Sequence, residues 1–306
     1  MKPSVTAKNI VKHYGSKDQK IQAVRGVSFD VQPGELFGII GPDGAGKTSL
    51  FRILTTLLLA DEGEATVDGF DVVKGYKEIR KRVGYMPGRF SLYQDLSVEE
   101  NLEFFATIFN TSIKENYGLI KDIYLQIEPF KNRRAGKLSG GMKQKLALCC
   151  ALIHRPSVLF LDEPTTGVDA VSRKEFWEML KNLKQQGITI LVSTPYMDEA
   201  RKCDRVALMQ SGNIMSIDTP EGIIEKFKAD LFAVRSSKML ALLDDLKNFN
   251  EVRDAYFFGA YHHVVMKEKN KAQELKNYLS KYVGDDLEIK VAHPDIEDCF
   301  IALMKN

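Results

Sequence analysis

The chain has 306 residues, of which 43 are Lys or Arg and 41 are Asp or Glu, so its formal net charge is +2. This length gives one large domain or two modest ones, and a composition of 44% hydrophobic and 27% charged residues excludes a mostly disordered or fibrous chain. The near-neutral charge gives no electrostatic footprint for nucleic acid, so we expect no nucleic-acid partner.

Apolar runs in the chain are of strand length, and none reaches the roughly 20 residues that a membrane span needs. The first ten residues lack the apolar core of a signal peptide, so we expect a cytoplasmic protein that meets a membrane only through a partner. The cysteines show no CxxC and no metal-ligand spacing, which predicts free, buried thiols. These cysteines are Cys149, Cys150, Cys203 and Cys299.

The amino-terminal part of the chain alternates between strand and helix patterns. An alternation begins at Val5, and we expect Tyr14-Gly15 to break it before a second strand. Residues 36–40 form a continuous apolar run, which is typical of a strand buried on both faces, and residues 49–59 have a helical pattern. The predicted strands are residues 5–11, 23–31, 36–40, 64–67 and 83–86.

Residues 89–137 differ in character and predict a helical insert. Ser97 and Glu100 have the spacing of a capping box, and apolar residues follow them at helical intervals. A second helix is expected over residues 114–127.

After the insert the alternation of helices and strands returns. It predicts a mainly parallel sheet that is covered on both faces. The expected helices are residues 140–153 and 172–186, and the expected strands are residues 158–161 and 188–192.

The pattern changes again after residue 217, where a small α+β domain is expected. The chain is therefore predicted to form two domains, residues 1–217 and 218–306. Helices are expected from Thr219-Pro220 and over residues 239–248 and 270–282, and strands over residues 231–234, 255–258, 262–266 and 287–291.

The strongest motif is residues 41–48, Gly-Pro-Asp-Gly-Ala-Gly-Lys-Thr, which fits G-x-x-x-x-G-K-[ST] between a buried strand and a helix. Glycines let backbone N–H groups turn toward phosphate oxygens, and a helix N-terminus adds partial positive charge. We expect Lys47 to reach the β and γ phosphates of a nucleotide and Thr48 to hold Mg²⁺ through its hydroxyl. The flanking strand and helix argue against the alternative, a Gly-rich turn with a chance lysine.

Two carboxylates follow the apolar strand at residues 158–161. Asp162 is placed to hold Mg²⁺ through water, as the strand-end Asp of nucleotide hydrolases does. Glu163 is placed to polarise an attacking water. Acidic residues after a strand are common, and the upstream phosphate loop is what favours a functional role for this pair.

A third motif is Leu138-Ser139-Gly140-Gly141, which opens a helix and exposes backbone donors at its N-terminus. Taken alone, the motif is better explained by a plain N-cap with a flexible turn.

In this order, the three motifs resemble the ATP-binding subunit of ATP-binding-cassette (ABC) transporters, whose signature is Leu-Ser-Gly-Gly. The resemblance covers about residues 4–217. It implies an α/β fold: a P-loop NTPase core with a mainly parallel sheet, an antiparallel β subdomain and a helical subdomain at about 89–137. The final domain, with its closing motif at residues 294–300, resembles the small α+β carboxy-terminal domain of multidrug and ABC-2-type exporters.

The resemblance also implies site residues. Tyr14 corresponds to the aromatic residue that stacks on adenine, although a plain surface tyrosine is the alternative. Lys47 and Glu163 are the expected catalytic residues, and Thr48 and Asp162 the expected Mg²⁺ ligands. The expected ATP contacts are Tyr14, Gly41, Asp43, Gly44, Ala45, Gly46, Lys47, Thr48, Ser49, Ser139, Gly140, Gly141 and Asp162.

In this family two cassettes face each other, and the phosphate loop of one and the signature of the other enclose each ATP. The resemblance thus implies that Ser139, Gly140 and Gly141 act on the partner's nucleotide. It implies as partners transmembrane permease subunits and a second cassette, in a homodimer or a heterodimer. Residues 164–169 resemble the loop that joins the two sites.

Two positions depart from the family pattern. Gly88 stands where the family has a Gln after the strand at residues 83–86, and Pro195 stands where it has a switch His. A proline cannot hydrogen-bond the γ-phosphate, and it has no N–H. The remaining histidines do not compensate: His154 is expected at a helix end, and His262 and His263 should point to opposite faces of a strand.

The expected function is an ATP-binding and ATP-hydrolysing subunit of an ABC exporter, located at the inner face of the cell membrane. The departures at Gly88 and Pro195 leave open a degenerate subunit that binds ATP while a partner cassette supplies efficient hydrolysis. A non-transport ABC ATPase of translation or DNA repair is a further alternative, but the chain has neither the second cassette nor the long coiled-coil insert typical of that class.

Overall fold

The computed structural model describes residues 2–16, 19–88, 92–269, 271–280 and 286–305. They form two compact units, residues 1–220 and 221–306. In the described part of the chain, no helix has both the length and the apolar character that crossing a bilayer requires. The prediction of free, buried thiols is confirmed for all four cysteines.

The first unit is organised around a six-stranded sheet with the order β10-β9-β3-β8-β7-β6. Strands β9, β3, β8, β7 and β6 pair in parallel, and β10 adds an antiparallel edge. Every residue of the three central strands is buried, as the apolar runs predicted. The strands are β3 (Leu36–Ile40), β6 (Val83–Met86), β7 (Val158–Asp162), β8 (Thr189–Thr194), β9 (Arg205–Gln210) and β10 (Asn213–Asp218).

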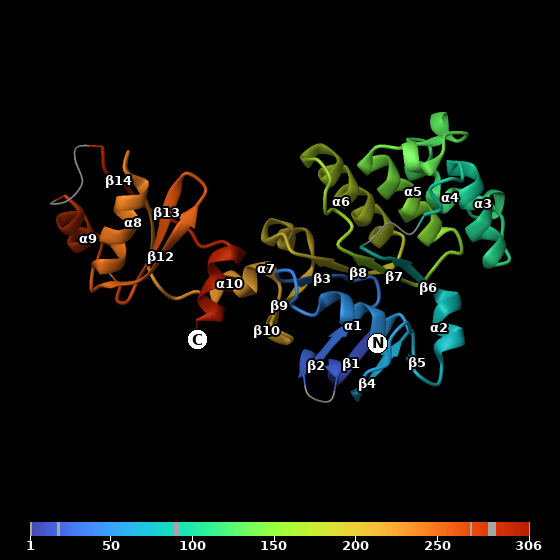
Figure 1. Ribbon diagram of the computed structural model, residues 1–306, viewed down its shortest axis with the longest axis horizontal. Helices are drawn as coiled ribbons and strands as arrows, with labels where there is room; N and C mark the ends of the chain where they lie inside the picture. The colour runs from blue at the N-terminus through green and yellow to red at the C-terminus, as the bar shows by residue number, and fades with distance from the viewer. Residues whose placement is uncertain (1, 17–18, 89–91, 270, 281–285, 306) are drawn as a thin grey trace. The chain divides into compact units, whose positions relative to one another are not determined.

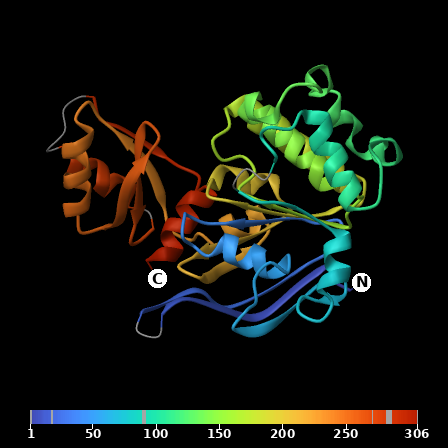
Figure 2. The same ribbon diagram turned by 45° about the vertical axis from the view of Figure 1, so that its right-hand side comes forward.

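A second, antiparallel sheet has the order β2-β1-β4-β5. It comprises β1 (Val5–Ser16), β2 (Gln19–Val31), β4 (Glu62–Val67) and β5 (Phe70–Asp71). The predicted break at Tyr14-Gly15 is wrong, because Gly15 takes a φ of 106° and still pairs with Lys20, so β1 continues to Ser16. Helix α1 (Lys47–Leu54) lies between the two sheets, where its buried face joins their common core (Figure 2).

Helix α1 ends earlier than the expected residue 59. The Thr55 hydroxyl donates to the Phe51 carbonyl at 2.8 Å, and Thr56 adopts a left-handed φ of 65°, which an L-residue in a helix does not take. The helix therefore stops at Leu54, and a short connection leads to β4.

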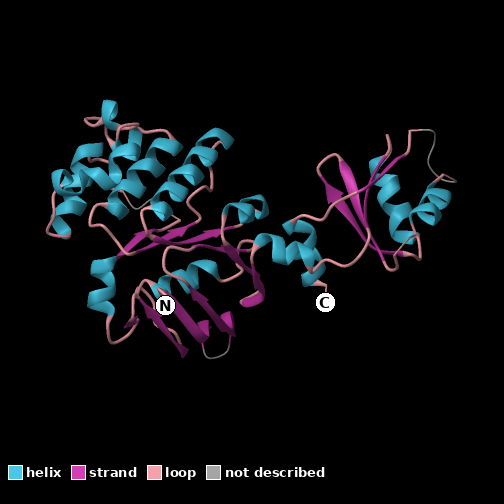
Figure 3. Ribbon diagram, turned by 180° about the vertical axis from the view of Figure 1, so that it is seen from behind, coloured by secondary structure: helices cyan, strands magenta, loops and turns pink. Residues whose placement is uncertain are grey.

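Helices α5 and α6 pack on the face of the six-stranded sheet opposite α1, and α3 and α4 pack on α5 (Figures 1 and 3). These helices are α3 (Val98–Ile108), α4 (Ile113–Tyr124), α5 (Gly140–Leu152) and α6 (Ala170–Gln185). The predicted capping box of Ser97 and Glu100 is confirmed at α3. The start of the expected helical insert, residues 89–91, lies outside the described residues. The structure also contains a helix that the sequence patterns do not predict, α2 (Tyr76–Arg82).

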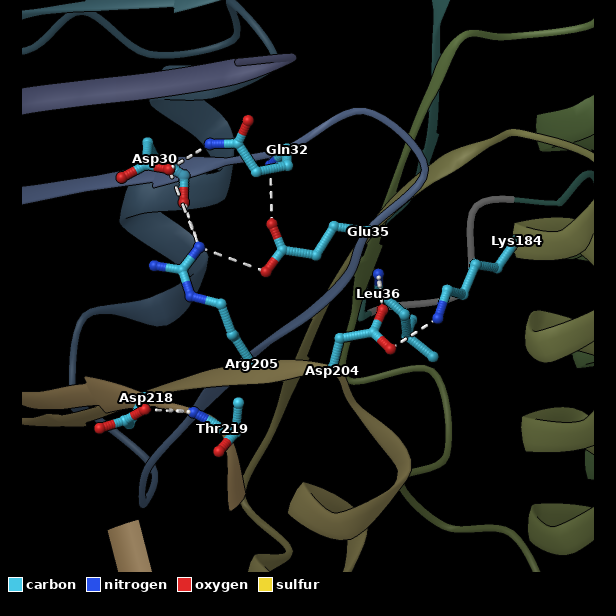
Figure 4. Close-up of polar contacts among 9 residues, drawn as sticks. All are labelled: Asp30, Gln32, Glu35, Leu36, Lys184, Asp204, Arg205, Asp218 and Thr219. Carbon is cyan, nitrogen blue, oxygen red and sulfur yellow. Dashed lines mark hydrogen bonds and ion pairs between the residues drawn. The ribbon is translucent and has the colours of Figure 1, made fainter. Parts of the chain in front are cut away.

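Polar contacts hold the amino ends of β3 and β9 together, at the edge of the sheet away from the phosphate loop (Figure 4). Asp204 accepts from the Leu36 N–H at 2.8 Å and from Lys184 at 2.5 Å. Arg205 donates to the nearly buried Glu35 at 3.3 Å. These contacts order β3, whose opposite end leads into the phosphate loop.

The second unit has the β-α-β-β-α-β order and the antiparallel strand order β12-β13-β11-β14 of a ferredoxin-like fold. Its elements are α7 (Pro220–Glu225), which begins at the unit boundary, β11 (Leu231–Arg235), α8 (Met239–Asn248), β12 (Val252–Phe258), β13 (Tyr261–Met266), α9 (Ala272–Leu279), β14 (Glu288–Val291) and α10 (Ile296–Met304). Residues 270, 281 and 282 of the predicted 270–282 helix lie outside the described residues.

Helix α10 is attached to this sheet by a fully buried carboxylate, Asp298. Its Oδ1 accepts from the Tyr256 hydroxyl at 2.8 Å and lies 2.6 Å from His263 Nδ1, while Oδ2 accepts from the Asp295 N–H at 2.8 Å. His262 bonds the Met239 carbonyl instead, so the two histidines serve opposite faces of β13, as predicted.

Candidate functional site

The phosphate loop joins the end of β3 to the start of α1. Gly46 precedes the helix with a φ of 105°, and a Cβ there would lie 2.2 Å from the Ala23 carbonyl oxygen, so only glycine fits. Gly44 is exposed with a φ of 77°, and Asp43 beside it is exposed as well. Gly41 and Ala45 are buried, so the loop rests on the sheet and presents its tip to solvent.

Lys47 is buried beneath this loop, with a side chain 3% exposed. Its ammonium donates to the carbonyls of Gly41 at 2.8 Å and Pro42 at 3.0 Å, and it lies 3.1 Å from Glu163 Oε1. The phosphate loop, the lysine and the candidate base predicted from sequence are thus in direct contact.

Thr48 and Asp162 face each other across the ends of α1 and β7. The Thr48 hydroxyl donates to Asp162 Oδ1 at 3.2 Å, and Asp162 is 2% exposed. A hydroxyl and a carboxylate are hard oxygen donors of the kind that Mg²⁺ takes alongside nucleotide phosphates, so this pair fits the ion. Within the residues that the structure describes, no group of three or more His, Cys, Asp and Glu offers a metal site elsewhere.

Glu163 leaves the strand in an unusual backbone conformation, with a φ of 51°. Its N–H donates to the carbonyl and to the hydroxyl of Ser193, both at 3.0 Å. This turn directs its side chain to Lys47, and a non-glycine residue in this region is a feature that clusters at functional sites.

Tyr14 lies near the end of β1 and is 40% exposed. Its hydroxyl is 3.0 Å from the hydroxyl of Ser49 in α1, next to Thr48. The structure therefore brings an accessible aromatic residue to the first turn of α1, where a nucleobase could stack on it.

Ser139 and Gly140 are exposed at the start of α5, on the side of the sheet opposite α1 (Figures 1 and 2). The Ser139 hydroxyl accepts from the Met142 N–H at 3.3 Å, which is the N-cap role weighed from the sequence. Gly141 has a packing role too, because a Cβ there would lie 2.7 Å from the Ser172 hydroxyl. Gly140 also lines a cavity together with Glu163.

The two unusual positions lie close to the carboxylates. Gly88 does not have a left-handed φ, but a Cβ there would lie 3.0 Å from the Asp162 carbonyl oxygen and 3.8 Å from the Glu163 Cβ. A cavity of about 250 Å³ adjoins Gly88 and Glu163. Pro195 follows β8 directly and is half-buried.

A buried carboxylate that the sequence reasoning missed lies behind Pro195. Glu199 is 2% exposed and accepts from the hydroxyls of Thr194 at 2.5 Å and Thr165 at 3.1 Å. Arg173 Nε lies 3.6 Å from Glu199 Oε1. Glu199 therefore ties the segment after Glu163 to the segment that carries Pro195.

An apolar groove of about 700 Å³ lies between the edge of the sheet and the first helix of the insert. Aromatic side chains line it, among them the exposed Tyr93 and Phe104, whose rings are 4.6 Å apart. His154 forms part of its wall and stacks on Phe109 at 3.8 Å.

Comparison with known proteins places this arrangement in a family. Residues 24–166 match the family model described as ABC transporter. The chain is 36% identical over 241 residues to the ABC transporter ATP-binding protein NatA of Bacillus subtilis (strain 168), covering 77% of this chain and 98% of NatA. It is 35% identical over 305 residues to the probable multidrug ABC transporter ATP-binding protein YbhF of Escherichia coli (strain K12), covering 98% of this chain.

The chain spans about half of YbhF, at 52% of that protein's length. Among solved structures, the dimeric post-hydrolysis state of the ATP-binding cassette MJ0796 bound to ADP and Pi superposes with a TM-score of 0.64. That match has 26% sequence identity and covers 70% of this chain and 98% of the cassette. The fold is therefore that of an ABC ATPase cassette, and the chain belongs to the ABC transporter family of ATP-binding proteins.

Proposed function

We propose that this chain binds and hydrolyses Mg-ATP and, as one of a pair of cassettes, drives export through separate membrane subunits. The observation that carries the proposal is the convergence of Lys47, Thr48, Asp162 and Glu163 where β3 and β7 end. These residues come from two segments more than a hundred positions apart, yet each contacts another member of the set.

ATP binding would begin with a change of partner for Lys47. The phosphates replace the Gly41 and Pro42 carbonyls as its ligands, since a charge-assisted bond to phosphate is stronger than one to a neutral carbonyl. This frees Glu163 from its ion pair. Thr48 and Asp162 would hold Mg²⁺, which neutralises charge on the phosphate oxygens.

Hydrolysis would then proceed by attack of water on the γ-phosphorus. Glu163 takes the proton from the water, the new P–O bond forms, and the bond between the γ-phosphorus and the bridging oxygen breaks to release ADP. The left-handed backbone of Glu163 supports this role, because it turns the carboxylate out of the strand direction toward the loop.

Dimer closure is supported by the exposure of Ser139 and Gly140 on the opposite side of the sheet from α1. Exposed backbone donors at a helix N-terminus suit an anionic ligand brought by another subunit. A second cassette, identical or different, would supply the phosphate loop that they face.

The apolar groove suits a helix from a membrane subunit, since exposed aromatic side chains such as Tyr93 and Phe104 are typical of protein interfaces. The proposed location is therefore the cytoplasmic face of the membrane, through that subunit. Export is supported by relatives named as multidrug and Nod factor export proteins.

A second candidate function is favoured by Pro195 and Gly88. With neither a His nor a Gln beside the γ-phosphate, the cassette would bind ATP and close while its partner hydrolyses faster. Glu163 is intact, so slow hydrolysis rather than none is expected of a self-paired dimer.

Glu163→Gln tests the proposal. The amide keeps the size of the side chain but cannot take a proton, so turnover should fall by about 10²–10⁴ and a closed, ATP-filled dimer should accumulate. Size-exclusion chromatography with Mg-ATP measures the dimer, and Glu178→Gln on the exposed face of α6 is the control. A Glu163→Gln protein that stays monomeric and turns over ATP like wild type contradicts the proposal.

A further inference from the structure

Ser193 lies at the end of β8, between the two strands that carry the candidate site. It is fully buried, and it pairs with Asp162 in the parallel register of β7 and β8. Its hydroxyl donates to Asp162 Oδ1 at 2.6 Å and accepts from the Glu163 N–H at 3.0 Å. One buried hydroxyl thus contacts both residues of the acidic pair.

The bond to Asp162 involves the same oxygen that Thr48 contacts. Oδ1 receives the Ser193 hydroxyl at 2.6 Å and the Thr48 hydroxyl at 3.2 Å. A short bond to an ionised acceptor is strong and directional, so the Ser193 bond restrains rotation of the carboxylate. The carboxylate is then held facing the start of α1 before a metal arrives.

The bond to Glu163 acts on the backbone. The Glu163 N–H is shared between the carbonyl and the hydroxyl of Ser193, and the residue has a left-handed φ of 51°. Two acceptors on one residue help to hold a conformation that an L-residue otherwise avoids. That conformation is the one in which the Glu163 carboxylate meets Lys47.

The neighbouring hydroxyl shows that the contact is selective. Thr194, the next residue along the strand, projects to the other side and bonds Glu199. Only Ser193, of this pair, reaches the acidic residues at the end of β7.

We propose that Ser193 is a positioning residue of the Mg-ATP site, which orients the Asp162 carboxylate for the metal and holds the turn that aims Glu163. The inference rests on the proposed function. Outer partners of metal ligands act in this way, and their loss typically costs about 10- to 100-fold in metal affinity or activity.

The test compares Ser193→Ala with Thr189→Val, which removes another buried hydroxyl at the far end of the same strand. Thr189 is 2% exposed and bonds the Gly34 N–H at 3.0 Å, away from Asp162. Calorimetry gives the affinity for ATP in excess Mg²⁺ and in EDTA, and the ratio of the two is the metal-dependent gain. ATPase rates are measured across a Mg²⁺ titration.

We expect Ser193→Ala to lose about 10- to 100-fold of the metal-dependent gain, with the affinity in EDTA nearly unchanged. Thr189→Val should keep the metal-dependent gain, even if its melting temperature falls as much as that of Ser193→Ala. Ser193→Thr keeps the hydroxyl and should retain the metal-dependent gain. Ser193→Cys offers only a weaker donor and should lose the gain. The Thr and Cys pair carries the test if the Ala variant does not fold.

A gain in Ser193→Ala equal to that of Thr189→Val would overturn the inference and leave the proposed function standing. If the wild-type protein itself shows no metal-dependent gain, the proposed function fails, and the role of Ser193 fails with it.

Discussion

Restoring the two departures from the family pattern, Pro195→His and Gly88→Gln, should raise the ATPase rate of the self-paired protein. A His after β8 would supply a donor to the γ-phosphate that proline lacks. A Gln at position 88 would point toward Asp162 and Glu163, because the direction of its Cβ is set by the backbone.

The size of the effect follows from the contacts at each position. One donor to developing negative charge is typically worth about 10²–10³ in turnover. The backbone of Gly88 is not left-handed, so a side chain is conformationally allowed, but its Cβ would be crowded at 3.0 Å from the Asp162 carbonyl. We therefore expect the double variant to gain about 10²- to 10³-fold, nearly all of it from the histidine.

The assay is steady-state ATPase at saturating Mg-ATP for both single variants and the double variant. Pro195→Ala and Gly88→Ala are the matched controls, because they remove the ring or add only a Cβ without a donor. A rise in the histidine variants but not in the alanine variants supports the reasoning. Wild-type turnover unchanged by either replacement would refute it and would point to another group at the γ-phosphate.

Two further predictions concern stability. Burial lowers the pKa of His154 to about 4, although its bond to the Val83 carbonyl acts in the opposite direction. The buried neutral imidazole therefore contributes stability above the unfolded-state pKa, and this stability is lost as the pH falls from about 6.5 to 4. Linkage gives a loss of about 2 kcal/mol at pH 5, which denaturant unfolding at pH 7 and 5 should show for wild type but not for His154→Phe. Asp298→Asn should weaken the attachment of α10 by about 1–3 kcal/mol, because a charged acceptor of two side-chain bonds is lost. Hydrogen exchange should then be faster in residues 296–304 and unchanged in β3, and equal protection of residues 296–304 in both proteins would contradict this role.

Local patterns predicted much of the fold. The buried strands β3 and β6 and the helix α8 have the predicted bounds, because an apolar run or a helical period is written in adjacent residues. The strands β9 and β10 were missed, although Val206 to Met209 is an apolar run of the kind used elsewhere. A short apolar run with no turn motif beside it does not distinguish a strand from a buried helix segment.

The strand order of the second unit could not be read from the sequence. A small α+β domain was expected, but ferredoxin-like pairing depends on which distant strands meet, and β11 pairs with both β13 and β14. Helix α10 is not among the predicted elements, although Asp295 and Asp298 form a capping box with the spacing that identified α3.

In the candidate site, too, residues that belong to a local motif could be predicted from the sequence, and residues that act through distant contacts could not. The loop glycines, Lys47 and Thr48 are adjacent in sequence, so their motif identified them. Ser193 and Glu199 act through contacts with residues about thirty positions away, and a single serine or glutamate near a strand end carries no sequence signal. Position 88 also needed the structure, because the obstacle to a side chain is a neighbouring carbonyl rather than its φ.

The measurement that tests the central claim most directly is the calorimetric titration of Mg-ATP into wild type and Lys47→Ala. Lys47 is the buried cation of the phosphate loop, so its loss should weaken ATP binding by at least about 10-fold, while Lys81→Ala, which removes an exposed ammonium, should bind as wild type does. Melting temperatures without nucleotide check that both variants are folded. Equal affinity of wild type and a folded Lys47→Ala protein for Mg-ATP would contradict the account.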